Sequence, residues 1–184
     1  MLGRLGIARR GFMSCIVHKG PPYPYSLVRD RSPKAQPASS GGSAMAAIRF
    51  AGASPDSRNE SIIGWIAQDA DDAQLGPRQF VENRAFWPVV LDVLEKHAHE
   101  DPELQAQAAF QKTGWMNIAD GRNPPPLGRT GSAEDIIGCV RVDDKEIQAG
   151  SFQANLAHRP VTADGLFQLP RFLQARLVDR LSSA

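Results

Sequence analysis

The chain has 184 residues, of which 42% are hydrophobic and 22% charged, and its formal net charge is +1. These values are typical of a soluble globular protein and argue against disorder of the whole chain. Charge is unevenly distributed, because residues 1–44 carry seven basic and one acidic side chain whereas residues 45–184 carry 14 basic and 19 acidic ones. A mildly acidic body excludes bulk nucleic-acid binding, which needs clustered Lys and Arg.

Residues 1–44 are predicted to be a disordered basic leader. The first twenty residues mix apolar side chains with four basic and no acidic ones, the composition of a mitochondrial presequence. The next 24 are rich in Pro, Ser and Gly and lack apolar periodicity. Three interpretations stay open: a cleavable mitochondrial leader, a plain disordered tail, and an upstream stretch that is not normally translated, with Met45 as the start. The predicted location is the mitochondrial matrix, with the cytoplasm as the alternative.

Residues 45–60 are interpreted as a linker, and residues 61–184 as a single domain. The domain begins with Ser61–Gln68, an apolar run that predicts a buried strand. A helix is expected from Trp87, because Pro88 disfavours a regular helix before it. Its predicted apolar face repeats at spacings of three and four and consists of Trp87, Val90, Leu91, Leu94 and Ala98.

A second helix should start at Asp101, which is a suitable N-cap before Pro102. We expect it to cover Leu104 to Thr113, to end at Gly114, and to form a helical hairpin with the first helix. Strand Gly114–Asp120 follows, and then a loop rich in glycine and proline, residues 121–135.

The remaining elements are a β-hairpin and a helix. Residues 135–153 predict the hairpin, with its turn at Asp143, Asp144 and Lys145. The C-terminal helix is predicted from leucines at steps of four, namely Leu169, Leu173, Leu177 and Leu181. The fold class is therefore α+β: a small antiparallel sheet, a helical hairpin and a C-terminal amphipathic helix. No segment approaches the roughly 18 apolar residues that span a bilayer.

Cofactor and metal signatures are not found in the sequence. His97 and His99 lie two residues apart, so on a helix they point in different directions and cannot share an ion. Cys139 lies in a predicted strand and is interpreted as a structural thiol, and the other cysteine, Cys15, lies in the leader. The glycines of the 121–135 loop do not match the spacing of a phosphate-binding or dinucleotide-binding loop. No cofactor and no metal are predicted.

The candidate ligand-binding residues are Arg122, Arg129 and Arg159. Arg122 and Arg129 flank three prolines, whose stiffness would limit the movement of the two guanidiniums. Together they could hold a carboxylate or a phosphate, with His158 and Arg159 contributing from the next loop. In the alternative interpretation, the two loop arginines pair with neighbouring acids, namely Asp120, Glu134 and Asp135.

From these features we expect a small non-enzymatic accessory or binding protein that recognises a protein partner or a small anionic ligand. The alternative is a small enzyme acting on an anionic metabolite, with Arg122 and Arg129 as anchors and His158 as the catalytic acid or base. A concave pocket shared by these three side chains would favour the enzyme.

Overall fold

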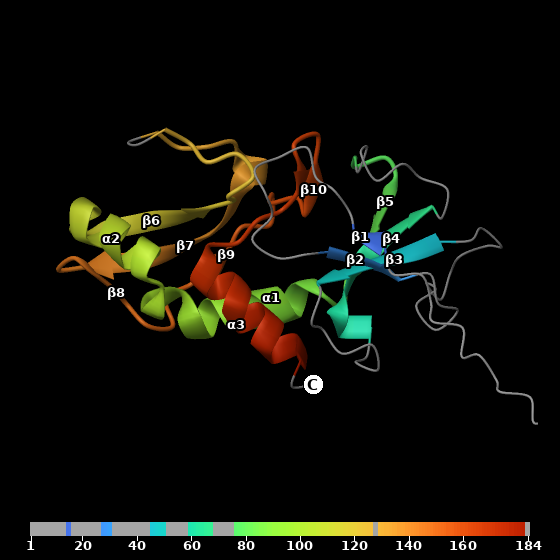
Figure 1. Cartoon of the computed structure of the whole chain (residues 1–184). Coiled ribbons are helices and arrows are strands. Elements are labelled where there is room, and N and C mark those ends of the chain that lie inside the picture. Colours follow the sequence, from blue (N-terminus) through green and yellow to red (C-terminus); the bar gives the residue numbers. More distant parts are fainter. Residues whose placement is uncertain are drawn as a thin grey trace, which may run out of the picture.

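The computed structural model describes residues 14–15, 27–30, 45–50, 59–67, 76–126 and 129–182. It confirms the α+β class, with three α-helices and antiparallel sheets. Figure 1 shows a five-stranded sheet on one side, a four-stranded sheet on the other, and helices α1 and α3 running between them. In the described part of the chain, no helix has both the length and the hydropathy that a membrane crossing requires.

The five-stranded sheet is built from strands that follow one another in the chain, each antiparallel to the next. These strands are β1 (Ser14–Cys15), β2 (Leu27–Asp30), β3 (Met45–Phe50), β4 (Ile62–Ala67) and β5 (Phe80–Glu82). A short 3-10 helix, Asn59–Ser61, precedes β4. The predicted strand Ser61–Gln68 is thus confirmed as β4, whose residues are buried up to Ile66.

Strand β3 corrects the interpretation of residues 45–60 as a linker. Five of its six residues are buried, and it pairs with β2 on one side and β4 on the other. A strand with both faces covered shows no alternation of apolar and polar residues, so residues 45–50 lack the usual sequence signal of a strand. Arg49 is buried in this strand and forms a salt bridge with Asp30 of β2, at 3.0 Å.

Strand β2 also corrects part of the predicted disordered leader. Its four residues pair in register with β3, and the buried Arg29 donates a hydrogen bond to the Ala67 carbonyl. Residues 14–15 of β1, which pair with β2, and residues 27–30 therefore belong to the sheet. The prediction of disorder for residues 1–13, 16–26 and 31–44 lies outside the described residues.

Helix α1 (Trp87–His97) begins at the predicted residue, with Pro88 in its first turn. Its buried face is wider than the predicted stripe, because Val89 and Val93 are buried as well as Val90 and Leu94. A 3-10 helix, Ala98–Glu100, joins α1 to α2 (Pro102–Gln111).

The two helices follow each other as predicted, but α1 packs along α3 (Arg171–Ser182) rather than along α2. Asp101 is the N-cap of α2, accepting hydrogen bonds from Glu103 N and Leu104 N at 2.8 and 3.0 Å. Helix α2 ends at Gln111, before the predicted end, because Lys112 adopts φ 75°.

The four-stranded sheet contains both the strand and the hairpin predicted after α2. Its central strand is β7 (Ile136–Asp143), which pairs with β6 (Gly114–Ala119) on one side and with β8 (Glu146–Ile147) and β9 (Gln153–Ala154) on the other. The turn between β7 and β8 has Asp144 at φ 46° and Lys145 at φ 71°, as in a two-residue hairpin turn. A further antiparallel pair of short strands, β10 (Val161–Thr162) and β11 (Gly165–Leu166), follows β9 in the chain and precedes α3.

A single apolar cluster contains residues from both larger sheets and all three helices. Its centre is an aromatic group: Phe50 of β3, Phe86 before α1, and Phe167 after β11 have ring centroids 6.1 to 6.5 Å apart. The leucines of the C-terminal helix are buried as their spacing predicted. This core fixes the segments that carry the candidate site.

Candidate functional site

Asp120, which follows β6, is the first member of a buried polar network. Its Oδ1 accepts hydrogen bonds from Arg122 N at 3.1 Å and from Gln168 N at 2.8 Å. Its Oδ2 lies 2.9 Å from His158 Nε2. The carboxylate therefore connects the end of β6 with His158 and Gln168, which lie 38 and 48 positions further along the chain.

Arg122 is the centre of this network, and its side chain is completely buried. Its Nε donates to Asp135 Oδ1 at 3.0 Å and lies 3.5 Å from Asp120 Oδ2. The terminal nitrogens donate to four backbone carbonyls, those of Glu134, Arg159, Pro160 and Gly165, at 2.7 to 3.3 Å.

A guanidinium has five N–H donors, so these contacts occupy its whole capacity. The prediction that Arg122 meets an external ligand is therefore not supported. For this residue the structure agrees with the alternative interpretation, in which neighbouring acids satisfy the guanidinium.

Further hydrogen bonds join the 121–135 loop to the segment 155–160. Asn155 Nδ2 donates to the carbonyls of Ala133 and Ile136, both at 2.7 Å, and Arg159 N donates to the Glu134 carbonyl at 3.2 Å. Within the loop, Asn123 Nδ2 donates to Asp135 Oδ2 at 3.1 Å. The two segments consequently form one unit, although residues 136–154 separate them in the chain.

His158 anchors this unit to the aromatic core. Its imidazole stacks on Trp87 of α1, with ring centroids 4.9 Å apart and an interplanar angle of 11°, and meets Phe167 edge-on. Because a carboxylate only accepts, Nε2 carries the proton that points to Asp120. The imidazole is completely buried, and its Nδ1 has no hydrogen-bond partner among the described residues.

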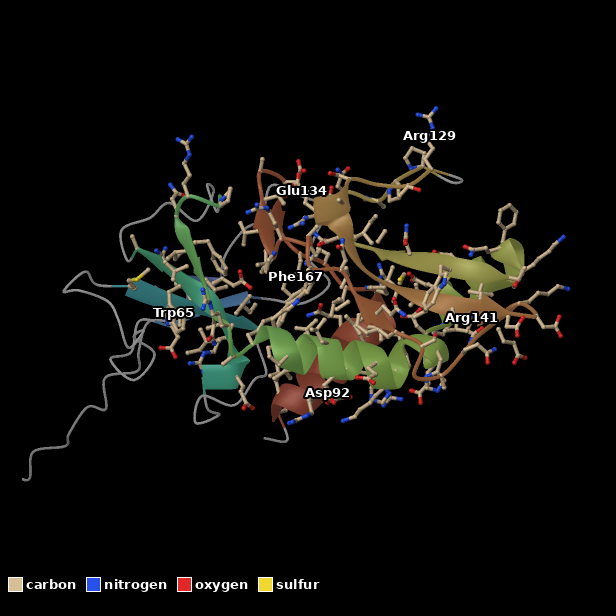
Figure 2. All side chains as sticks on the ribbon, turned by 180° about the vertical axis from the view of Figure 1, so that it is seen from behind. Trp65, Asp92, Arg129, Glu134, Arg141 and Phe167 are labelled. Carbon is tan, nitrogen blue, oxygen red and sulfur yellow. The ribbon has the colours of Figure 1, made fainter. Side chains whose placement is uncertain are left out.

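The structure separates the other two predicted arginines from this network. Figure 2 shows Arg129 at the tip of its loop, pointing away from the body, and Phe167 in the interior. Arg129 and Arg159 are both exposed, and the side chain of neither forms an ion pair or hydrogen bond within the described residues. Arg122, Arg129 and His158 thus do not converge on a shared pocket.

Leu156 is a feature of this region that the sequence analysis missed. Its side chain is 99% exposed. The residues around it are nevertheless fixed, since Ala157 N donates to Asn155 Oδ1 at 3.0 Å and His158 N donates to the Asn155 carbonyl at 3.2 Å. An Asn that closes a tight turn before a solvent-facing apolar residue is a weak sequence signal.

A shallow groove of about 340 Å³ lies on the other side of Asp120, between the first turns of α2 and α3. Glu103 and Gln107 line one wall, and Gln168 and Arg171 line another. None of the predicted ligand-binding residues lines this groove.

His97 and Cys139, which the sequence did not favour as a metal ligand or a reactive thiol, have the following surroundings. His97 Nδ1 lies 2.9 Å from Glu100 Oε2, and this hydrogen bond lowers the pKa of Glu100 below its ordinary value of 4.5. Cys139 is half-buried in β7, and desolvation raises the pKa of its thiol. No cluster of three or more metal-ligating side chains occurs in the described ranges.

No protein-family model matches the chain, and searches of curated proteins and of solved structures find no match either.

Proposed function

We propose that this protein is a non-enzymatic binding protein that recognises a protein partner through a preformed surface made of Glu134, Leu156 and Arg159. We refer to these three residues as the docking surface. Arg129 lies at the tip of the adjoining loop and points away from the body (Figure 2).

The observation that supports this proposal is the exposure of Leu156 on segments that a buried arginine holds in place. Arg122 and Asn155 together hold both the 133–136 and the 155–160 backbones. A surface that is already ordered loses little conformational entropy on binding, so a larger part of its contact energy contributes to affinity. An apolar side chain on such a surface is suited to fill a pocket of the partner.

The charged side chains of the docking surface define what kind of pocket would fit. Arg159 and Arg129 are exposed cations without a partner among the described residues, and Glu134 is the exposed acid beside them. The partner's pocket should therefore be apolar at its centre and acidic at its rim.

Two contacts weigh against the alternative of a small enzyme. Arg122 has no donor left for a substrate, and His158 is enclosed between Asp120 and Trp87. A catalytic acid or base must come within hydrogen-bond reach of the substrate, which a completely buried imidazole cannot do without rearrangement.

The test compares Leu156→Asp with Val81→Asp in the tagged full-length chain. Val81 is an exposed apolar residue of β5 in the five-stranded sheet, outside the docking surface, and is thus the control. A protein from native extract that binds the wild type and Val81→Asp, but binds Leu156→Asp at least tenfold more weakly, supports the proposal. Equal binding to all three proteins contradicts it.

We also propose the mitochondrial matrix as the location, supported by the basic, acid-free first twenty residues. Because β2 belongs to the sheet, cleavage should occur before Leu27, and cleavage after Cys15 would remove β1 from that sheet. N-terminal sequencing of the endogenous protein tests both points, and a start at Met45 with no longer precursor in cells would exclude them.

A further inference from the structure

Among the strands that the structure describes, β6 pairs with β7 alone and is therefore an edge of the four-stranded sheet. Its sequence, Gly-Trp-Met-Asn-Ile-Ala, contains no charged residue and no proline. Sheet edges normally carry charges, prolines or bulges that prevent pairing with another chain. In β6 the irregularity between Ile118 and Ala119 lies at its end, and the Gln111 side chain occupies the outward carbonyl of Trp115, so the middle of the strand is left open.

The other edge strands in the described part of the chain are better protected against pairing. Strands β1, β8 and β9 have two residues each, and β5 has three and includes Glu82. Strand β6, with six residues, is the longest uncharged edge among them.

The outward direction of the β6 backbone follows from one hydrogen bond. Gln111 Nε2 donates to the Trp115 carbonyl at 2.9 Å, which shows that the backbone of Trp115 faces away from β7. Residues two apart in a strand point their backbone groups the same way, so the N–H and C=O of Asn117 also face outward. No described segment hydrogen-bonds to either group.

Exposed aromatic side chains lie beside this edge. Trp115 is 49% exposed and faces solvent opposite Arg141 of β7. Phe110, which is 83% exposed, precedes the Gln111 that contacts the edge. Ala119, two residues beyond Asn117, is small, so a large side chain from a pairing strand has room above it.

We propose that β6 pairs with β6 of a second copy of this chain, antiparallel and with the two-fold axis at Asn117. The two Asn117 residues then exchange their N–H···O=C hydrogen bonds, and Trp115 of each copy lies opposite Ala119 of the other. Around a two-fold axis, the outward N–H and C=O groups of each β6 strand gain hydrogen-bond partners from the other copy. Two-fold dimers are also the commonest assemblies of soluble proteins. Because the strand carries no charge, bringing two copies together involves no repulsion at the edge.

The surface available indicates a weak dimer. Buried aromatic side chains contribute roughly 150 to 250 Å² each, so Trp115 and Phe110 with the strand would bury about 1,000 Å² in total from both copies. This area is at the lower limit for specific association, and we expect a Kd of about 10 to 100 µM.

Sedimentation equilibrium of the full chain, from about 1 to about 300 µM, tests the proposal. The wild type should change from monomer to dimer. Asn117→Lys and Asn117→Glu should each stay monomeric, because two side chains of like charge then face each other across the axis, with Cβ atoms about 5 Å apart. An equimolar mixture of the two variants should dimerise again, since opposite charges then face each other.

Gln153→Lys is the matched control, because Gln153 is an exposed residue of β9 and pairs with Cys139 on the far side of β7 from Asn117. It should leave the Kd unchanged within about twofold. Thermal unfolding of each variant checks that it folds. As a second measurement without substitution, amide exchange of Asn117 should slow with protein concentration, because its outward N–H becomes hydrogen-bonded only in the dimer.

The proposal is overturned if the wild type remains monomeric at every concentration. It is also overturned if Asn117→Lys dimerises as the wild type does, or if Gln153→Lys abolishes the dimer. These outcomes are independent of binding at the docking surface, so the two proposals can fail separately.

Discussion

Replacing Arg122 by alanine should destabilise the protein severely. The substitution leaves Asp135 and Asp120 buried without their cation and deprives four backbone carbonyls of a donor. Removing one partner of a buried ion pair costs about 3 to 5 kcal/mol. Domains of this size are stable by about 5 to 15 kcal/mol, so the loss is a large share of the total.

Urea unfolding at neutral pH, followed by circular dichroism, measures this loss. Arg122→Lys keeps the charge but not the fork of donors, so we expect about half the effect. Arg129→Ala removes an exposed arginine from the same loop and should change the unfolding free energy by less than about 0.5 kcal/mol. An unfolding free energy of Arg122→Ala within about 1 kcal/mol of the wild type would contradict this expectation.

Four other results are expected from the structure. Asp101→Ala removes the N-cap of α2 and should lower the unfolding free energy by about 1 kcal/mol in urea titrations. Leu177→Ala empties a completely buried site in α3 and should cost about 2 to 5 kcal/mol by the same measurement. Alkylation of Cys139, followed by peptide mass spectrometry at pH 8, should be slower than that of a free thiol and should accelerate in denaturant, because desolvation raises the pKa of this thiol. The hydrogen bond from His97 lowers the pKa of Glu100, so its carboxylate stabilises the folded state above the ordinary value of 4.5. The difference in melting temperature between wild type and Glu100→Gln should therefore vanish as the pH falls below that value.

Elements whose signals are local could be predicted from the sequence. The leucines of α3 recur at steps of four because one helical face meets the core. Asp101 could be identified as a cap because a cap depends only on the residues that follow it. The Asp144–Lys145 turn is similarly a property of a few adjacent residues.

The structure of the N-terminal part could not be predicted in the same way. Strand β3 is covered on both faces, so its short run of small residues has no alternation. Arg49 is buried in this strand because it pairs with Asp30, and Asp30 lies in the segment that was predicted to be disordered. A buried charge can be understood only when both partners are known.

For the candidate site, the sequence identified several residues of the buried Arg122 network but not how they contact one another. It identified Arg122, His158 and the acids of the 121–135 loop, and left open whether the arginine is satisfied internally. Four of the acceptors of Arg122 are backbone carbonyls. Every residue has a backbone carbonyl, so the sequence does not indicate which of them will accept from the arginine. The roles of Asn155 and Leu156 likewise depend on which loop lies beside them.

The Arg122 contacts also bear on how long the folded state lasts. The guanidinium joins Asp135, 13 residues away, to Arg159 and Gly165, 37 and 43 residues away. Such contacts form only after several chain closures have been completed, so they develop late in folding. Interactions that are absent from the transition state slow unfolding without accelerating folding. The buried arginine therefore acts chiefly on the lifetime of the native protein, and so on its resistance to irreversible loss, rather than on the speed at which it is made.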